Sequence, residues 1–232
     1  MKKLVIAALL LLPIVAIAGP VLVEEGPLVT IEEFNPASSS FVCVPGNLYN
    51  ANTVGYYNLY AGNESYAVLI NPSECPTCDM GFAFSRVRML LRLNAGATFQ
   101  ISASVADVID NGGGCYVPGA VQASSGVGNV AGIATTGGYY INLTWASPCI
   151  DPGRPYFLIF NFPNLGTGVA GPYVDNNGAG ACFSYRNTGT GWVNLAAAGF
   201  VGDPFVWAET DCCSSPVGVE NSNWGSVKTS FR

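Results

Sequence analysis

The residues able to carry out catalysis form a small set, because the chain has no histidine. This excludes Ser–His and Cys–His nucleophilic pairs, zinc sites built on imidazole, and the usual general base near neutral pH. Paired carboxylates would still serve a glycoside hydrolase or lyase. Most acids lie beside Gly, Pro or Asn, where turn formation is the more frequent role; the candidates are Asp107, Asp110, Asp151, Asp175, Asp203, Glu209 and Asp211. Only Glu209 lies in a strand-like run, so the sequence leans away from an enzyme.

Cysteines are the second reactive group, and their even number indicates disulfides in an exported protein. The eight are Cys43, Cys75, Cys78, Cys115, Cys149, Cys182, Cys212 and Cys213. The one CxxC lacks the second pair that a zinc site needs and the βαβ context of a redox motif. Many pairings are compatible with eight cysteines. We favour Cys75–Cys78 and Cys115–Cys149, with Cys43 and Cys182 bonded to Cys212 and Cys213 in either order.

Two groups of residues are candidates for binding. Asp175, Asn176 and Asn177 offer the oxygen ligands that Ca²⁺ prefers, as does the segment 107–111, although neither matches an EF-hand loop. Acidic turns without metal are commoner, so we expect no cofactor unless calcium binds here. Aromatic residues would give sugar rings a stacking platform if they share an exposed face, although large aromatics more often fill sandwich cores. The candidates are Trp145, Trp192, Trp207 and Tyr185.

The first 18 residues have the three parts of a secretory signal peptide. Met1-Lys2-Lys3 is basic, residues 4–18 are apolar, and Ala16-Ile17-Ala18 places small residues at −3 and −1 of a cleavage point. The apolar run is shorter than the roughly 20 residues of a membrane span, and Pro13 interrupts it. We therefore expect cleavage after Ala18, no membrane span afterwards, and a secreted or cell-surface protein.

Charge and composition limit the partners. The formal net charge is −6, and loss of Lys2 and Lys3 with the signal peptide makes it −8, which disfavours nucleic acid because phosphate binding depends on Lys and Arg. Half of the residues are hydrophobic and 10% are charged, so the chain has enough apolar surface to fold. Glycans or other surface proteins are the partners that this composition permits.

Strand-like segments bounded by turn residues recur about every ten residues. They lie at 56–60, 66–70, 81–93, 97–108, 139–145, 156–162 and 201–209, with a hairpin formed by 178–186 and 191–195. In 81–93 one parity carries Arg86, Arg88 and Arg92, and the other is apolar, as on the two faces of a strand. The arginines would bind a carboxylate or sulfate ligand or, more often, form ion pairs with acids on neighbouring strands. With no convincing amphipathic helix, the pattern predicts an all-β, antiparallel, jelly-roll-like β-sandwich stapled by disulfides.

The expected organisation has four parts. A signal peptide (1–18) precedes an extended lead-in (19–45) with at most one short strand at 28–31. The β-sandwich (46–213) follows, and then a linker and tail (214–232). Within the tail, Trp224, Val227 and Phe231 have helical spacing, which alone would be marginal in water.

Part of the chain resembles a known group of proteins. The resemblance is carried by Cys75-Pro76-Thr77-Cys78, Gly114-Cys115-Tyr116-Val117-Pro118-Gly119, Ser147-Pro148-Cys149 and Cys182-Phe183-Ser184-Tyr185. The block 65–213 resembles secreted bacterial proteins of uncharacterised activity. The ending, with Trp224, Gly225, Lys228 and Arg232, is similar to the Trp-Gly-x-Ile/Val-Lys-x-x-Phe/Tyr-Arg ending of many exported bacterial proteins. The resemblance implies an extracellular β-sandwich with a C-terminal sorting or attachment tail, and no catalytic residue.

Three functions follow in order of expectation. The first is a non-catalytic secreted or cell-surface protein with a structural, adhesive or assembly role. The second is a carbohydrate-binding module using surface Trp and Tyr. The third is a glycoside hydrolase or lyase, which needs two carboxylates facing each other in a cleft.

Overall fold

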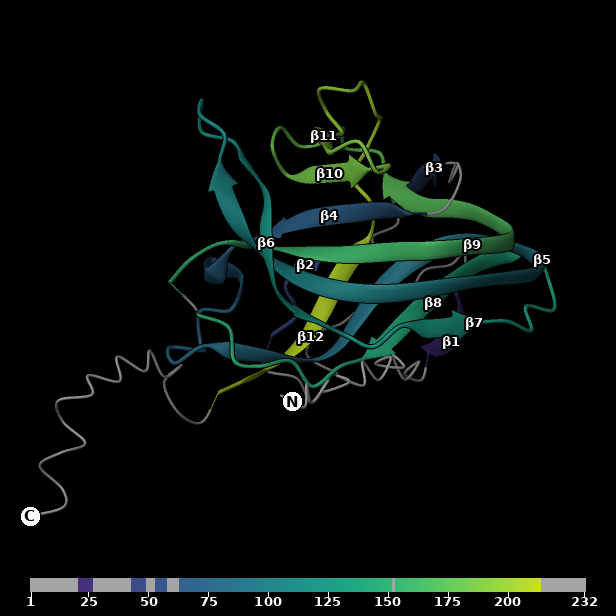
Figure 1. The fold of residues 1–232 in the computed structure, drawn as a ribbon, viewed down its shortest axis with the longest axis horizontal. Coiled ribbons are helices and arrows are strands. Elements are labelled where there is room, and N and C mark those ends of the chain that lie inside the picture. Colours follow the sequence, from purple (N-terminus) through teal and green to yellow (C-terminus); the bar gives the residue numbers. More distant parts are fainter. Residues whose placement is uncertain (1–20, 27–42, 49–52, 58–62, 152, 214–232) are drawn as a thin grey trace, which may run out of the picture.

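The computed structural model describes residues 21–26, 43–48, 53–57, 63–151 and 153–213. The regular secondary structure of these residues is all β-strand apart from one 3₁₀ turn, η2 (Pro72–Glu74), and every strand pairing is antiparallel. The strands are β1 (Val21–Gly26), β2 (Gly46–Asn47), β3 (Thr53–Tyr56), β4 (Glu64–Ile70), β5 (Phe82–Asp110), β6 (Tyr116–Ser124), β7 (Gly128–Val130), β8 (Gly137–Thr144), β9 (Tyr156–Asp175), β10 (Ser184–Asn187), β11 (Trp192–Asn194) and β12 (Val206–Cys212) (Figure 1). The all-β antiparallel prediction is confirmed. No helix in the described part is long and apolar enough to cross a membrane.

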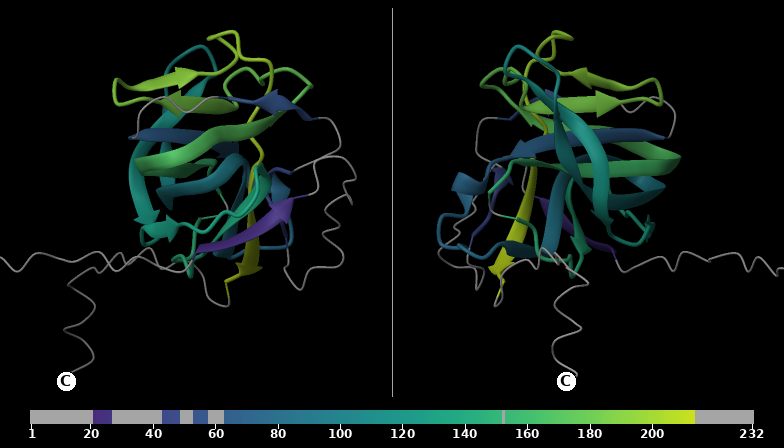
Figure 2. Two further views of the ribbon diagram at one scale, coloured as in Figure 1. Left: turned by 90° about the vertical axis from the view of Figure 1, so that its right-hand side faces the viewer. Right: turned by 60° about the vertical axis from the view of Figure 1, so that its left-hand side comes forward.

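The strands form one curled sheet whose two halves make two layers (Figures 1 and 2). The first layer has the order β1-β8-β5-β12-β2, and the second has the order β5-β9-β4-β10-β11, with β6 and β7 on the other edge of β5. Strand β5 belongs to both, because residues 82–93 pair with β8 and β12 while residues 98–107 pair with β9. Strand β9 follows β5 between the layers, since it also pairs with residues 91–93. The sandwich is therefore one sheet folded over, rather than two separate sheets.

Strand β5 passes from the first layer to the second near a glycine, and we call this place the fold-over. The sequence predicts separate strands at 81–93 and 97–108, but the structure joins them into the 29 residues of β5. Gly96 has a φ of +76°, which residues with a Cβ rarely adopt. The pairing with β9 shifts register between Leu93 and Thr98 at the same place. The glycine thus lets a single strand turn from one layer into the other without a loop.

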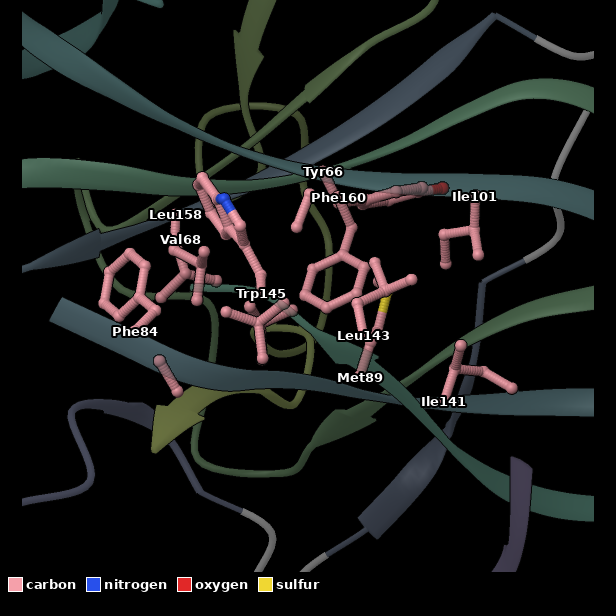
Figure 3. Packing of buried hydrophobic residues seen from close by; sticks show 14 of the residues in the cluster. Tyr66, Val68, Phe84, Met89, Ile101, Ile141, Leu143, Trp145, Leu158 and Phe160 are labelled. Carbon is pink, nitrogen blue, oxygen red and sulfur yellow. The ribbon is translucent and has the colours of Figure 1, made fainter. Parts of the chain in front are cut away.

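The core fills the space between the two layers. Val87, Met89 and Leu91 of the first layer and Ile101 and Phe160 of the second belong to one buried cluster (Figure 3). Alternate residues of each strand point into it, as the period of two predicts. Smaller buried clusters cover the outer faces, one around Trp207 on the first layer and one around Phe157 on the second.

A bulge corrects the predicted parity of the arginine strand. Counting by twos places Phe84 on the same face as Arg86, yet Phe84 is buried in the main core. The ladder with β12 pairs Arg86 with Glu209 and Phe84 with Thr210, so Ser85 is an extra residue on β5. An extra residue reverses which face the following side chains occupy. The prediction holds from Arg86 onward.

The N-terminal lead-in contributes one strand to the described structure, β1 at Val21–Gly26. The sequence predicts at most one short strand in this lead-in, at 28–31, a segment that lies outside the described residues. Strand β1 pairs with β8 along its whole length, from Val21↔Leu143 to Gly26↔Gly138. Part of the predicted lead-in (19–45) therefore pairs with the sheet.

All eight cysteines are in disulfides, as predicted, but the predicted partners are wrong. The bonds are Cys43–Cys75, Cys78–Cys212, Cys115–Cys182 and Cys149–Cys213. Short spacing suggested Cys75–Cys78, but the two residues bond to cysteines on opposite ends of the domain sequence. Disulfide partners need Cα atoms roughly 4.4–6.8 Å apart, and the sheet, not the sequence spacing, provides those distances.

The side chain of Asn142 in β8 is fully buried. Among the residues that the structure describes, neither its Oδ1 nor its Nδ2 has a hydrogen-bond partner. It lies between Leu22 and Arg88 in the ladders on either side of β8. Burial of an unpaired amide costs about 1–3 kcal/mol.

Asn142→Val is therefore expected to raise the free energy of unfolding by about 1–3 kcal/mol. The test is urea denaturation of the oxidised protein. Asn129→Val is the matched control, because Asn129 is an exposed strand residue whose Oδ1 accepts a hydrogen bond from Gln100. A lower stability for Asn142→Val than for the wild type would show that the amide has a stabilising role.

Candidate functional site

Three disulfides gather at one end of the sandwich, around the end of β12. We call this region the disulfide-bonded end; it contains Cys43–Cys75, Cys78–Cys212 and Cys149–Cys213. Neighbouring residues are joined by backbone hydrogen bonds as well: the N–H of Cys213 donates to Gly81, and Phe82 and Ile150 exchange two bonds. The last strand of the domain is therefore held by both covalent and hydrogen bonds immediately before the tail.

A pocket of about 230 Å³ opens beside the disulfide-bonded end. It lies where the end of β5 and the end of β6 meet residues 148–151 and 154–156. Its walls combine apolar and polar side chains: Val105, Asp107, Gln122, Ala123, Pro148, Cys149, Ile150, Asp151, Arg154, Pro155 and Tyr156. This volume corresponds to a small ligand rather than to an extended polymer groove.

The pocket brings together two of the predicted carboxylates. Asp107 accepts a hydrogen bond from Nε2 of Gln122 at 2.5 Å, and Asp151 lies 3.7 Å from Nε of Arg154. Both acids are exposed to solvent. Tyr156 lies in the wall and its hydroxyl, which is buried, has no hydrogen-bond partner among the described residues. The pocket therefore presents hydrogen-bond donors and acceptors, and both negative and positive charge, to a polar ligand.

The aromatic platform predicted from sequence does not form. Trp145 and Trp207 are buried, and Tyr185 is buried against Phe157 with its ring 5.5 Å from that ring. Only Trp192 of the four is partly exposed, and it packs against the cluster around Phe157. Three of these residues therefore fill the core instead of presenting a face to sugar, the alternative that the sequence also favoured.

The arginine face pairs with an acid of the neighbouring strand, as preferred from sequence. Glu209 of β12 is buried, and its two carboxylate oxygens lie 2.5 Å from Nε of Arg86 and 3.1 Å from Nε of Arg88. The third arginine, Arg92, lies 5.5 Å from the ring centre of Tyr56 and donates to the hydroxyl of Tyr173. Arg86 and Arg88 are thus engaged within the sheet rather than presented to an anion.

The predicted calcium ligands are used in a hydrogen-bond network. Asp175 is buried at the end of β9, where one carboxylate oxygen accepts from Nδ2 of Asn47 and the other from the N–H of Asp203. With its amide nitrogen facing Asp175, Asn177 donates to the same carboxylate. Asn176 is exposed. Within the described residues no three acids or cysteines are grouped as metal ligands, so calcium binding stays a prediction.

Asp203 lies beside this network and is itself buried. It accepts hydrogen bonds from the Ser184 hydroxyl and from the N–H of Gly180. Burial raises the pKa of Asp203 above its ordinary value of 3.8, and the charge of Asp175 raises it further, against the two hydrogen bonds. This carboxyl therefore takes up a proton more readily in the folded protein than in the unfolded chain.

Acidification is expected to stabilise the wild type relative to Asp203→Asn. Because the folded-state pKa is raised, protonation favours the folded state as pH falls through that pKa toward 3.8, and the variant lacks this contribution. The difference between their unfolding free energies, measured at about pH 7 and about pH 4, should shift in favour of the wild type. Asp110→Asn, at an exposed turn, serves as the control. A constant difference would contradict the assignment.

Sequence reasoning missed several polar residues that the sheet brings together. Gln122 and Arg154 line the pocket, and Arg186 forms a buried ion pair with Glu64 at 2.8 Å. Arg186 ends the predicted segment 178–186, whereas Glu64 lies two residues before the predicted segment 66–70. The pairing of β4 with β10, however, is not encoded by any local pattern. The tail residues Trp224, Gly225, Lys228 and Arg232 lie outside the described residues.

Comparison with known proteins gives one distant structural likeness. No family model matches the chain, and no curated protein sequence matches it significantly. A match among solved structures is the crystal structure of the cysteine protease and lectin-like domains of Cwp84, a surface layer associated protein of Clostridium difficile, with 15% identity and a TM-score of 0.42. The alignment covers 71% of this chain and 37% of that chain, so this chain spans well under two thirds of the length of the protein it matches.

Proposed function

We propose that the chain is an exported, non-catalytic protein of the cell surface with a structural, adhesive or assembly role, attached through its C-terminal tail. The observation that carries the proposal is the disulfide-bonded end. Disulfides of this density are found in oxidising compartments outside the cytoplasm. Here they are concentrated where the folded domain meets residues 214–232, the segment that resembles an attachment signal.

The geometry of β12 suits a point of attachment. Strand β12 lies between β5 and β2 in the first layer; it ends at Cys212, and Cys213 follows it directly. Cys212 bonds to Cys78 and Cys213 bonds to Cys149, which belong to two different loops. A tail fixed to the cell envelope would therefore be joined to the domain through two separate covalent links.

The carboxylates support a non-catalytic role. Glu209 is paired with two arginines, and Asp175 and Asp203 accept hydrogen bonds from neighbouring groups. Asp107 and Asp151, the two acids that share a pocket, are both exposed. A general acid in a glycosidase instead needs a low-polarity environment that keeps it protonated near neutral pH.

Expression of the full chain in a bacterial host tests this proposal. We expect a mature protein that begins at Gly19, with a mass lower by eight hydrogens than that of its reduced form. Deletion of residues 217–232 should move the protein from the cell surface to the medium. The point variant Lys228→Ala with Arg232→Ala should do the same, and Thr229→Ala with Ser230→Ala is the matched control. A full-length cytoplasmic protein, or a surface fraction that the deletion leaves unchanged, would overturn the proposal.

Carbohydrate binding is the second candidate, and the pocket is the observation that favours it. Carboxylates, an amide and a guanidinium line a volume suited to a single polyhydroxylated ring. Glycan-array screening of the oxidised protein, compared with Asp107→Ala and Asp151→Ala, tests this candidate. Binding lost in both variants would support the pocket as the site, and an array without binding would count against it.

A further inference from the structure

We propose that β1 is an exchangeable strand, and that residues 21–26 of one copy pair with β8 of a second copy. The inference rests on the proposed surface role, for which it names the partner: another molecule of the same chain. It is argued from the pairing of β1, the exposed edge that its departure would leave, and the position of the disulfides.

The first argument is that β1 has one pairing partner among the described strands. Its six residues form a continuous antiparallel ladder with β8, without a register shift. The other edge of β8 pairs with β5. Displacement of β1 would therefore break one ladder and leave the rest of the sheet intact.

The second argument concerns the edge that β1 covers. Strand β8 has the sequence Gly-Gly-Tyr-Tyr-Ile-Asn-Leu-Thr, and its inward-facing Tyr139, Ile141 and Leu143 are buried in the main core. It contains no charge and no proline, which are the usual means of protecting an edge strand from pairing with another chain. A β8 edge without β1 would thus readily accept an extended segment.

The third argument is the position of β1 relative to the disulfides. The first cysteine of the chain is Cys43, so β1 lies outside every covalent loop. By contrast, β12 ends at the bonded Cys212 and is followed by the bonded Cys213. Residues 27–42 connect β1 to Cys43 and span up to roughly 55 Å when extended. A globular domain of this size has a radius of gyration of about 16 Å, so a neighbour's β8 is within reach.

A second copy fits this edge better than an unrelated protein does, because exchange reproduces the ladder already seen within one chain. The register Val21↔Leu143 to Gly26↔Gly138 is available to any copy. The same contacts form in both states, so exchange between copies costs little enthalpy and is favoured by high local concentration. A protein held at a surface meets that condition.

The test compares the oxidised mature chain with Val23→Pro/Glu24→Pro. Neighbouring backbone N–H groups on a strand point in alternate directions, and proline has no N–H. Replacing two consecutive residues by proline therefore removes a backbone hydrogen bond from β1 to β8, whichever of the two residues donates it. Val29→Pro/Thr30→Pro, outside β1, is the matched control. Light scattering after size-exclusion chromatography measures the oligomers formed at high concentration and after a brief denaturant pulse without reductant.

We expect the wild type and the control to form oligomers, and the β1 variant to form about tenfold fewer. A fluorescent peptide of residues 19–26 should bind the β1 variant more strongly than the wild type. In the variant, the weakened β1 covers the edge of β8 for a smaller fraction of the time. A wild type that stays monomeric under both conditions, or oligomers that are unchanged in the β1 variant, would overturn the inference. Neither result affects export or tail-dependent attachment, so failure of this inference is distinguishable from failure of the proposed function.

Discussion

Glu209→Ala is expected to lower the free energy of unfolding by about 3–5 kcal/mol, the loss typical when one member of a buried charge pair is removed. Glu209 has a side-chain exposure of 1%, and it forms ion pairs with both Arg86 and Arg88. Those two side chains are 26% and 12% exposed. The variant would leave two partly buried guanidinium groups close together without this carboxylate between them.

Asp211→Asn on the same strand is the control for this effect. Asp211 is exposed and accepts a hydrogen bond from Ser85, so its replacement should change stability by well under half as much. Chemical denaturation of both oxidised variants provides the comparison. The pairing would be shown to be unimportant if Glu209→Ala unfolded at the same denaturant concentration as Asp211→Asn.

The double variant Cys78→Ser/Cys212→Ser is expected to have a free energy of unfolding lower by about 5 kcal/mol than that of the wild type. The bond joins residues separated by 134 positions, but Cys149–Cys213 already shortens that loop to about 70 residues. The loop that reopens accounts for about 4 kcal/mol of chain entropy. A serine hydroxyl at the buried position of Cys78 adds about 1 kcal/mol or more.

Cys115→Ser/Cys182→Ser is a comparison of nearly equal loop length, since those residues are 67 positions apart. Both cysteines lie outside the buried core, so the free energy of unfolding of this variant should fall only by the loop-entropy contribution. Calorimetry and denaturant titration without reductant would measure the two losses. Equal losses would contradict a role for burial at Cys78, and a smaller loss for Cys78→Ser/Cys212→Ser would contradict the loop argument.

Local patterns predicted the strands well because they depend on neighbouring residues. The alternation around Met89 and Leu91, the apolar run at 156–162 and the hairpin turn at Asn187 all reappear in the structure. At that turn, Oδ1 of Asn187 accepts hydrogen bonds from the N–H groups of Gly189 and Gly191. Such interactions are complete within a few residues, so a sequence pattern contains the information that determines them.

The candidate sites were harder to predict because they depend on which distant strands become neighbours. Trp207 is an attractive stacking residue in the sequence, yet its strand lies inside the first layer, between β5 and β2, and its ring contacts Tyr140. Asp107 and Asp151 share a pocket because the segment after β8 returns to the end of β5. Neither the bulge at Ser85 nor the fold-over near Gly96 has a signal strong enough to specify those pairings in advance.

The CxxC segment has a mechanical consequence. Cys43 bonds to Cys75, two residues lead to Cys78, and Cys78 bonds to Cys212, which is next to Cys213. A continuous covalent path therefore runs from Cys43 to the residues that precede the C-terminal tail through the loop 75–78, bypassing β2 to β11. Tension applied between the two ends would follow this path, so the sandwich would bear little load and its unfolding would add almost no length. The molecule would behave as a tether of fixed length carrying a domain at its side.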